Sequence, residues 1–205
     1  MRGRRPGAFP RDVEIVPVGH NRDFPLNARH RRGIPLAVRH AAVQVKRQHN
    51  LFEAVVAVEV TSSAIGDAPV LPDLLDQISP QEKIARVTAD GAYDTRACHD
   101  AIAARGAIAI IPPRKNARLW QPTTDGAKAR NDALRASKRL GRALWRKWSG
   151  YHRRSRVEAK MNCIKQLGQR LMAKAFDRQV AEVQIRAAIL NRFTALGTPA
   201  TARVA

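Results

Sequence analysis

Apolar and polar residues follow a regular pattern only after residue 51, and there the pattern predicts alternating strands and helices. Three short runs rich in β-branched residues are typical of strands, at 52–61, 84–89 and 107–111. Two stretches between them favour helices, at 68–78 and 95–105. Asp67 is expected to cap the first helix, and Asp94 or Thr95 the second. This alternation predicts an α/β sheet with parallel pairs.

The second half of the chain is helical in pattern. Residues 127–148 are rich in Arg and Lys, and residues 177–196 carry apolar side chains at helical spacing. Trp145 and Trp148 lie three residues apart on one side of the first helix. They can belong to the core or form a platform for stacked bases, and we favour the core.

Residues 151–165 carry an unusual set of side chains on one predicted helix face. At about 100° per residue, Tyr151, Arg154, Glu158 and Lys165 fall within an arc of about 60°. A phenol, a guanidinium, a carboxylate and an ammonium group would share that face. Taken alone, this pattern favours a solvated basic helix with one acidic residue over a functional site. Evidence from the rest of the sequence is needed to distinguish the two interpretations.

Residues 1–50 differ in composition from all that follows. They are rich in Arg, His and Pro, and Pro17 and Pro35 interrupt their short apolar pieces. Neither a helical nor a strand period persists there. The segment can be a basic arm that wraps nucleic acid, a stretch without folded structure, or the product of a shifted reading frame. We favour the last two interpretations.

The composition limits the kinds of partner that the protein is expected to bind. The 205 residues suit one domain, and the formal net charge of +20 favours a polyanion, with nucleic acid as the default partner. No run approaches the roughly 20 apolar residues of a membrane span. Cys98 and Cys163 lie too far apart in sequence to indicate a disulfide framework or a zinc site. The basic N-terminus lacks the apolar stretch of a secretory signal, so we expect a cytoplasmic protein.

Two loops that follow predicted strands carry candidate chemistry. Asp90 ends the second strand, where functional side chains of α/β sheets gather, although Asp also commonly caps turns. Arg114, Lys115 and Arg118 follow the third strand and can contact a nucleic-acid backbone or form an ordinary solvated loop. If Glu158 packed near Asp90, the two carboxylates could hold Mg²⁺.

Several motifs occur together in one order. The residues Tyr151, Arg154, Glu158 and Lys165 match the spacing Y-x2-R-x3-E-x6-K, and the chain contains A-D-G-A-Y-D-T, I-P-P-R-K-N-A and L-N-R-F-T-A-L-G-T-P. From about Val55 to Pro199 the sequence therefore resembles bacterial insertion-sequence transposases of the DDE superfamily, and within them the group built around insertion sequence five.

The resemblance implies a ribonuclease-H-like α/β fold with a helical C-terminal part. It also implies Mg²⁺-dependent cleavage and joining of DNA strands, and binding to double-stranded DNA at terminal inverted repeats. By position, Asp90 and Glu158 correspond to the second and third metal-binding acids. Further catalytic residues are then Tyr151, Arg154 and Lys165. The residues expected to contact DNA are Arg114, Lys115, Arg118, Arg153 and Arg156.

One expected acid is absent from its place. The first acid of the family should end a strand shortly before Glu59, near His49 or Asn50, and no Asp lies between Asp23 and Asp67. We therefore expect a fold that is incomplete at its N-terminal strand. The predicted parts are a disordered or frame-disrupted segment at 1–50, a partial catalytic domain at 51–199 and a loose tail at 200–205.

The missing acid leads to a functional expectation. We expect a truncated transposase with little or no activity alone. The alternatives are a non-catalytic DNA-binding fragment, which modulates the intact transposase by occupying DNA ends or by forming mixed oligomers, and a nuclease that cleaves without joining.

Overall fold

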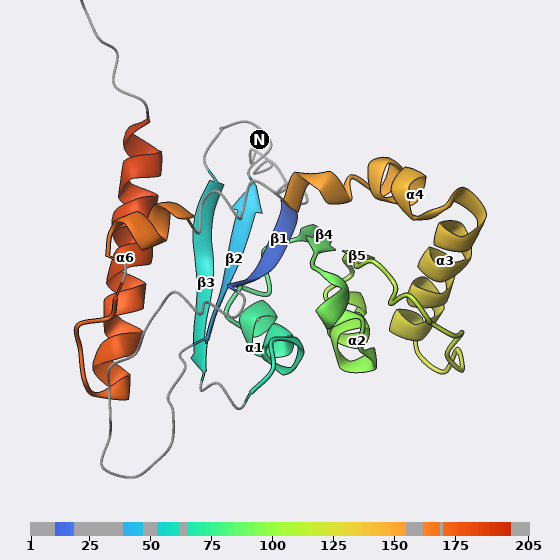
Figure 1. Cartoon of the computed structure of the whole chain (residues 1–205), viewed down its shortest axis with the longest axis horizontal. Helices are drawn as coiled ribbons and strands as arrows, with labels where there is room; N and C mark the ends of the chain where they lie inside the picture. The colour runs from blue at the N-terminus through green and yellow to red at the C-terminus, as the bar shows by residue number, and fades with distance from the viewer. Residues whose placement is uncertain are drawn as a thin grey trace, which may run out of the picture.

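A five-stranded mixed sheet forms the centre of the molecule (Figure 1). The computed structural model describes residues 11–18, 39–46, 53–61, 65–154, 162–168 and 170–197. The strands are β1 (Arg11–Val18), β2 (Arg39–Lys46), β3 (Glu53–Thr61), β4 (Ile84–Thr88) and β5 (Ile108–Ile110). Their order across the sheet is β3-β2-β1-β4-β5, so β1 lies at the centre.

The two halves of the sheet differ in direction. β1 pairs with β2, and β2 with β3, in antiparallel ladders, whereas β1–β4 and β4–β5 are parallel. On β1, Glu14 is in register with Thr88 of β4 and with Gln44 of β2. Because β1 and β4 are parallel, their carboxyl ends meet at the same edge of the sheet.

β1 and β2 correct the expectation for residues 1–50. We expected no regular structure there and a sheet that is incomplete at its N-terminal strand. Residues 11–18 and 39–46 instead form strands in the middle of the sheet. Their ladder bonds depend on neighbouring strands, which explains why the local pattern failed to reveal them. Whether the segment arose from a shifted reading frame stays a hypothesis.

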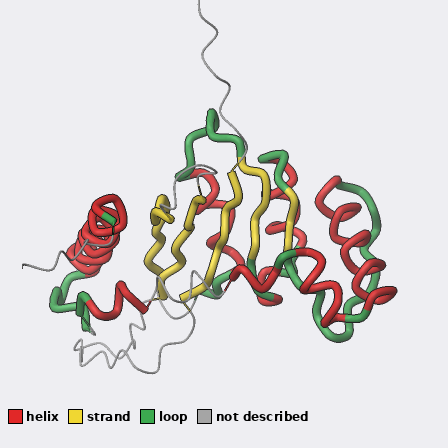
Figure 2. Tube along the Cα trace, turned by 90° about the horizontal axis from the view of Figure 1, so that it is seen from above, coloured by secondary structure: helices red, strands yellow, loops and turns green. Residues whose placement is uncertain are grey.

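Helices lie along the sheet and beyond both of its edges (Figures 1 and 2). The α-helices are α1 (Leu71–Asp76), α2 (Arg96–Ala104), α3 (Asp125–Leu140), α4 (Arg142–Ser149) and α6 (Phe176–Leu196). The 3-10 helices are η1 (Ala68–Val70), η2 (Gly91–Tyr93) and η3 (Tyr151–Arg154). A further helical stretch covers 162–166. None of the helices in these described ranges is long and apolar enough to cross a membrane.

The helix boundaries confirm part of the sequence-based expectation and correct the rest. The Thr95 hydroxyl accepts from the Cys98 N–H and caps α2, whereas the Asp67 side chain makes no capping bond. Gly141, at a φ of 79°, separates α3 from α4. The predicted helix over 151–165 begins as the 3-10 helix η3 and is helical again at 162–166, while 155–161 lie outside the described residues.

Two apolar clusters hold helices against the sheet. The larger one joins β4 to α1 and α2 through Leu71, Leu74, Val87, Tyr93 and Ile102, among others. The smaller one contains Val55 of β3, Ile164, and Ala187 and Leu190 of α6. It is reinforced by Asn191, whose amide accepts from the Val55 N–H at 2.8 Å and donates to the Val55 carbonyl at 2.7 Å. These two bonds satisfy backbone groups of an edge strand.

Gly126 marks the closest approach of α3 to α2. A Cβ at this position would lie 2.4 Å from Asp100 Oδ1 and 2.6 Å from the Asp100 nitrogen. The Thr124 hydroxyl, which caps α3, also donates to Asp100 Oδ1 at 2.6 Å. Only glycine therefore allows the start of α3 to rest on α2.

Replacing Gly126 by Ala is expected to lower the free energy of unfolding by about 1–3 kcal/mol, because the added methyl group overpacks a contact with backbone. Thermal and urea unfolding measure the change. Ala129→Ser, at an exposed position of the same helix, serves as the control and should change stability by less than about 0.5 kcal/mol. Equal stabilities of the two variants would contradict this account of the α2–α3 contact.

Candidate active site

Asp90 lies just beyond the carboxyl end of β4, as the sequence predicts. It precedes η2, and its Oδ1 accepts from the Ala92 N–H at 2.8 Å. The residue is half-buried. A Cβ on Gly91 would lie 3.3 Å from the Pro112 carbonyl oxygen, so the loop after β4 runs close to the loop after β5. Asp90 thus caps a turn and also places a carboxylate where the two loops meet.

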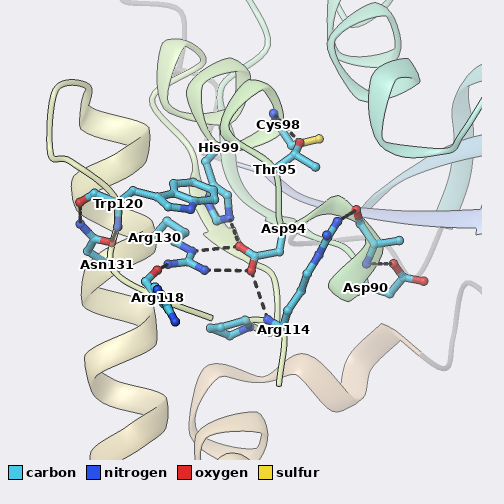
Figure 3. Close-up of polar contacts among 12 residues, drawn as sticks. Asp90, Asp94, Thr95, Cys98, His99, Arg114, Arg118, Trp120, Arg130 and Asn131 are labelled. Carbon is cyan, nitrogen blue, oxygen red and sulfur yellow. Dashed lines mark hydrogen bonds and ion pairs between the residues drawn. The ribbon is translucent and has the colours of Figure 1, made fainter. Parts of the chain in front are cut away.

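A buried ion pair fixes these two loops (Figure 3). The Asp94 side chain is about 1% exposed and receives two bonds from Arg130 of α3, Nε to Oδ1 and Nη2 to Oδ2, each of 3.1 Å. His99 Nε2 lies 3.2 Å from Oδ1, and the Arg114 N–H donates to Oδ2 at 3.1 Å. We call Asp94, His99, Arg114 and Arg130 the Asp94 cluster. It joins the loop after β4, helices α2 and α3, and the loop after β5.

The Asp94 cluster favours a charged carboxylate. Burial alone would raise the pKa of Asp94, but hydrogen bonds from His99, Arg130 and the Arg114 N–H, with the positive charge of Arg130, hold the pKa well below its usual range. Asp94 is therefore ionised whenever the protein is folded near neutral pH.

Trp120 covers the Asp94 cluster. The Arg130 guanidinium lies 4.2 Å from the centre of its ring, and His99 meets the ring edge-on at 5.5 Å. The Asn131 side chain accepts from the backbone N–H of Trp120 at 2.9 Å and donates to the backbone carbonyl of Trp120 at 2.8 Å. The indole is thus packed against Arg130 and His99. His99 is buried here.

The basic loop after β5 lies beside the Asp90 loop. Arg114, Lys115 and Arg118 are exposed. The Arg114 guanidinium donates to the Ala92 carbonyl at 3.5 Å, and the Arg118 carbonyl accepts from Arg130. The loop is therefore held at its backbone and through the Arg114 side chain, while Lys115 and Arg118 face solvent. Contact of these cations with DNA stays a prediction.

The residues predicted on the 151–165 face are only partly described. Tyr151 belongs to η3, is half-buried, and has the Arg146 guanidinium 5.5 Å from its ring centre. Arg153 and Arg154 lie in η3, which runs beside β1. Their side chains, like Arg156 and Glu158 as a whole, lie outside the described residues. The pairing of Glu158 with Asp90 therefore stays a prediction.

Lys165 is half-buried in the stretch 162–166, next to Ile164 of the smaller apolar cluster. The loop that follows is fixed by α6. Arg186 donates to the carbonyls of Gly168 and Arg170, each at 2.6 Å. Glu182 Oε2 accepts from the N–H groups of Met172 and Ala173. These contacts tie the end of the predicted catalytic segment to the β3 side of the sheet.

The ligand atoms available near Asp90 determine whether this region can bind a divalent metal ion. Asp90 offers a hard carboxylate oxygen of the kind Mg²⁺ prefers. Among the residues that the structure describes, no three His, Cys, Asp or Glu side chains form a group able to hold a metal. The fit therefore depends on carboxylates whose side chains lie outside that part, namely those of Glu158 and of Glu14 on β1.

The Asp94–Arg130 pair was not predicted from the sequence. Asp94 was considered only as a helix cap, and Arg130 only as one of many cations in a basic helix. The partners are 36 residues apart, and neither their spacing nor their types distinguish them from surface residues. One available signal was that Asp94 belongs to the same A-D-G-A-Y-D-T motif as Asp90.

Comparison with known proteins yields one family. The model of the family described as "Transposase DDE domain" matches residues 12–192, a range that includes β2 and all of β1 except Arg11. No solved structure matches the chain significantly.

Arg130→Met is expected to lower the free energy of unfolding by about 3–5 kcal/mol, because it leaves Asp94 buried without its charge partner. Arg135→Met breaks the exposed pair with Asp132 in the same helix and serves as the control, with an expected change below about 1 kcal/mol. Urea unfolding followed by circular dichroism measures both. The assignment of a structural role to Asp94 fails if the two variants lose equal stability.

Proposed function

We propose, because the chain belongs to the transposase DDE domain family, that it moves an insertion sequence by cutting and joining DNA strands at terminal inverted repeats. The observation that carries the proposal is the position of Asp90 at the carboxyl end of β4, next to the central strand β1, within the range matched by the family. The order β3-β2-β1-β4-β5, half antiparallel and half parallel, supports a ribonuclease-H-like fold. The motifs of the chain favour the group built around insertion sequence five.

Asp90 and Glu158 are proposed as ligands of Mg²⁺. When bound, the ion supplies charge stabilisation at the scissile phosphate and an activated oxygen nucleophile. We further propose Glu14 as a third carboxylate, because it is in register with Thr88, two residues before Asp90. Glu14 would then take the place of the acid that the sequence analysis sought near His49 or Asn50.

The remaining candidate residues act on the DNA itself. Arg154 and Lys165 would neutralise charge that develops on the phosphate, and Tyr151 would position a phosphate oxygen. Arg114, Lys115, Arg118, Arg153 and Arg156 would contact the backbone away from the cut. The Asp94 cluster supports this arrangement, because it holds Arg114 against the Asp90 loop.

Charge supports double-stranded DNA as the partner. A net charge of +20 recruits phosphate backbones and makes binding fall steeply as salt rises. We place the protein in the cytoplasm, where it reaches bacterial DNA, and expect it to act with a second copy or with an intact transposase.

A second candidate function is a non-catalytic DNA-binding protein that occupies the ends of the element or joins an intact transposase. The charge favours it equally. In this case the chain would be inactive alone, as the sequence analysis expects.

The deciding experiment incubates the purified full chain with Mg²⁺ and a labelled duplex that carries the inverted repeat flanking its own coding sequence. Cleavage and joining are expected, and Asp90→Asn should lower the rate at least about 100-fold, because it removes a metal ligand. Glu14→Gln should lower it similarly. Asp125→Asn, at an exposed carboxylate that pairs with Lys128, is the matched control and should leave the rate unchanged.

The outcomes separate the two functions. Salt-dependent binding to the repeat without cleavage supports the non-catalytic protein and contradicts the catalytic proposal. Cleavage that survives Asp90→Asn contradicts the assigned site. If the wild-type chain binds no DNA, both functions are wrong.

A further inference from the structure

Helix α4 exposes an aromatic side chain that the core does not use. Trp145 is 3% exposed and anchors the helix, whereas Trp148 is 72% exposed. Leu144, one turn before Trp148, is 53% exposed and lies on the same side of the helix. Both tryptophans were expected in the core, and for Trp148 this prediction is wrong. We call Leu144 and Trp148 the α4 apolar pair.

The sequence around the α4 apolar pair is rich in cations. Helix α4 carries Arg142, Arg146 and Lys147 and no acidic residue, and the last turn of α3 adds Lys138 and Arg139. Lys147 is adjacent to Trp148 and one turn from Leu144. An exposed ring with an aliphatic neighbour, set among positive charges, suits a ligand that is both flat and anionic. Nucleotides of a DNA strand combine these two properties.

The pair also lies near the candidate active site. The Arg142 guanidinium donates to the Pro113 carbonyl at 3.2 Å, so the start of α4 is fixed to the residue before Arg114. At the other end, Arg146 lies over Tyr151 of η3, which runs beside β1. Figure 1 shows α4 and η3 along one end of the sheet, between β1 and α3.

We propose that Trp148, supported by Leu144, stacks on an unpaired base of the DNA next to the strand that is cut. The stacked base gains contact with the indole, while Lys147 and cations of the last turn of α3 hold neighbouring phosphates. Stacking does not read base identity, because every base offers a π face. This inference rests on the proposed function and adds a single-stranded segment to its substrate.

A second copy of the chain is a poor occupant of this surface. A symmetric contact would place the same helix opposite itself and bring the cations of two α4 helices together. With a charge of +20 on each copy, such a contact is repulsive. Charge complementarity therefore favours the nucleic acid.

The test measures binding of the full chain to two fluorescent duplexes of the same sequence, one blunt and one with a five-nucleotide single-stranded extension. Trp148→Ala is expected to weaken binding of the extended duplex about tenfold and of the blunt duplex less than about twofold. Trp148→Phe should retain most of the affinity. Met172→Ala removes another highly exposed apolar side chain, 83% exposed and outside α4, and should change neither value.

Two results would overturn the inference: an unchanged affinity of Trp148→Ala for the extended duplex, or an equal loss for both duplexes. Sedimentation of wild type and Trp148→Ala adds a third, since a dimer that dissociates in the variant would identify a second copy as the occupant. If Trp148→Ala selectively weakens binding of the extended duplex and the wild-type chain cleaves no DNA, the inference is supported and the catalytic function is contradicted.

Discussion

The buried ion pair between Asp94 and Arg130 is the contact on which the candidate site depends. A charge that is about 1% exposed is stable in a protein only when its partners satisfy it, and here three elements supply them. Arg130 comes from α3, His99 from α2, and the Arg114 N–H from the loop after β5. The bonds that stabilise the buried Asp94 carboxylate therefore fix the position of the basic loop relative to Asp90.

A second set of contacts fixes the position of chain segments on the β3 side of the sheet. Asn191 ties α6 to the edge strand β3, and Arg186 ties the loop after the 162–166 stretch to α6. The predicted catalytic segment is thereby anchored at both ends, through η3 beside β1 and through Ile164 against the β3 side. In the sheet, the central strand β1 lies between β3, which these contacts involve, and the strands β4 and β5, whose loops the Asp94 cluster joins. The second set works through backbone groups of β3 and of the loop after 162–166, whereas the Asp94 cluster joins three side chains and one backbone N–H.

Local pattern predicted the elements whose own residues specify them. β3, β4 and β5 have β-branched runs bounded by turn residues, and α2 has a Thr95 cap and a following glycine. β1 and β2 were missed because their stability comes from strands on both sides rather than from a strong local period. Trp148 was misplaced because a spacing of three residues turns a helix by about 300°, which leaves room for one ring inside and the next outside. The Asp94–Arg130 pair joins distant parts of the chain, and only the fold brings it together.

The central claim is that Asp90 helps to bind a divalent ion beside β1. Paramagnetic broadening by Mn²⁺ in the nuclear magnetic resonance spectrum of the full chain tests this most directly, because the effect depends on proximity and needs no catalysis. If Asp90 binds the ion, the first amide signals to disappear belong to residues around Glu14, Asp90 and Glu158, and Asp90→Asn abolishes this pattern. Broadening confined to exposed acids such as Asp125 and Asp132, and unchanged by Asp90→Asn, would contradict it.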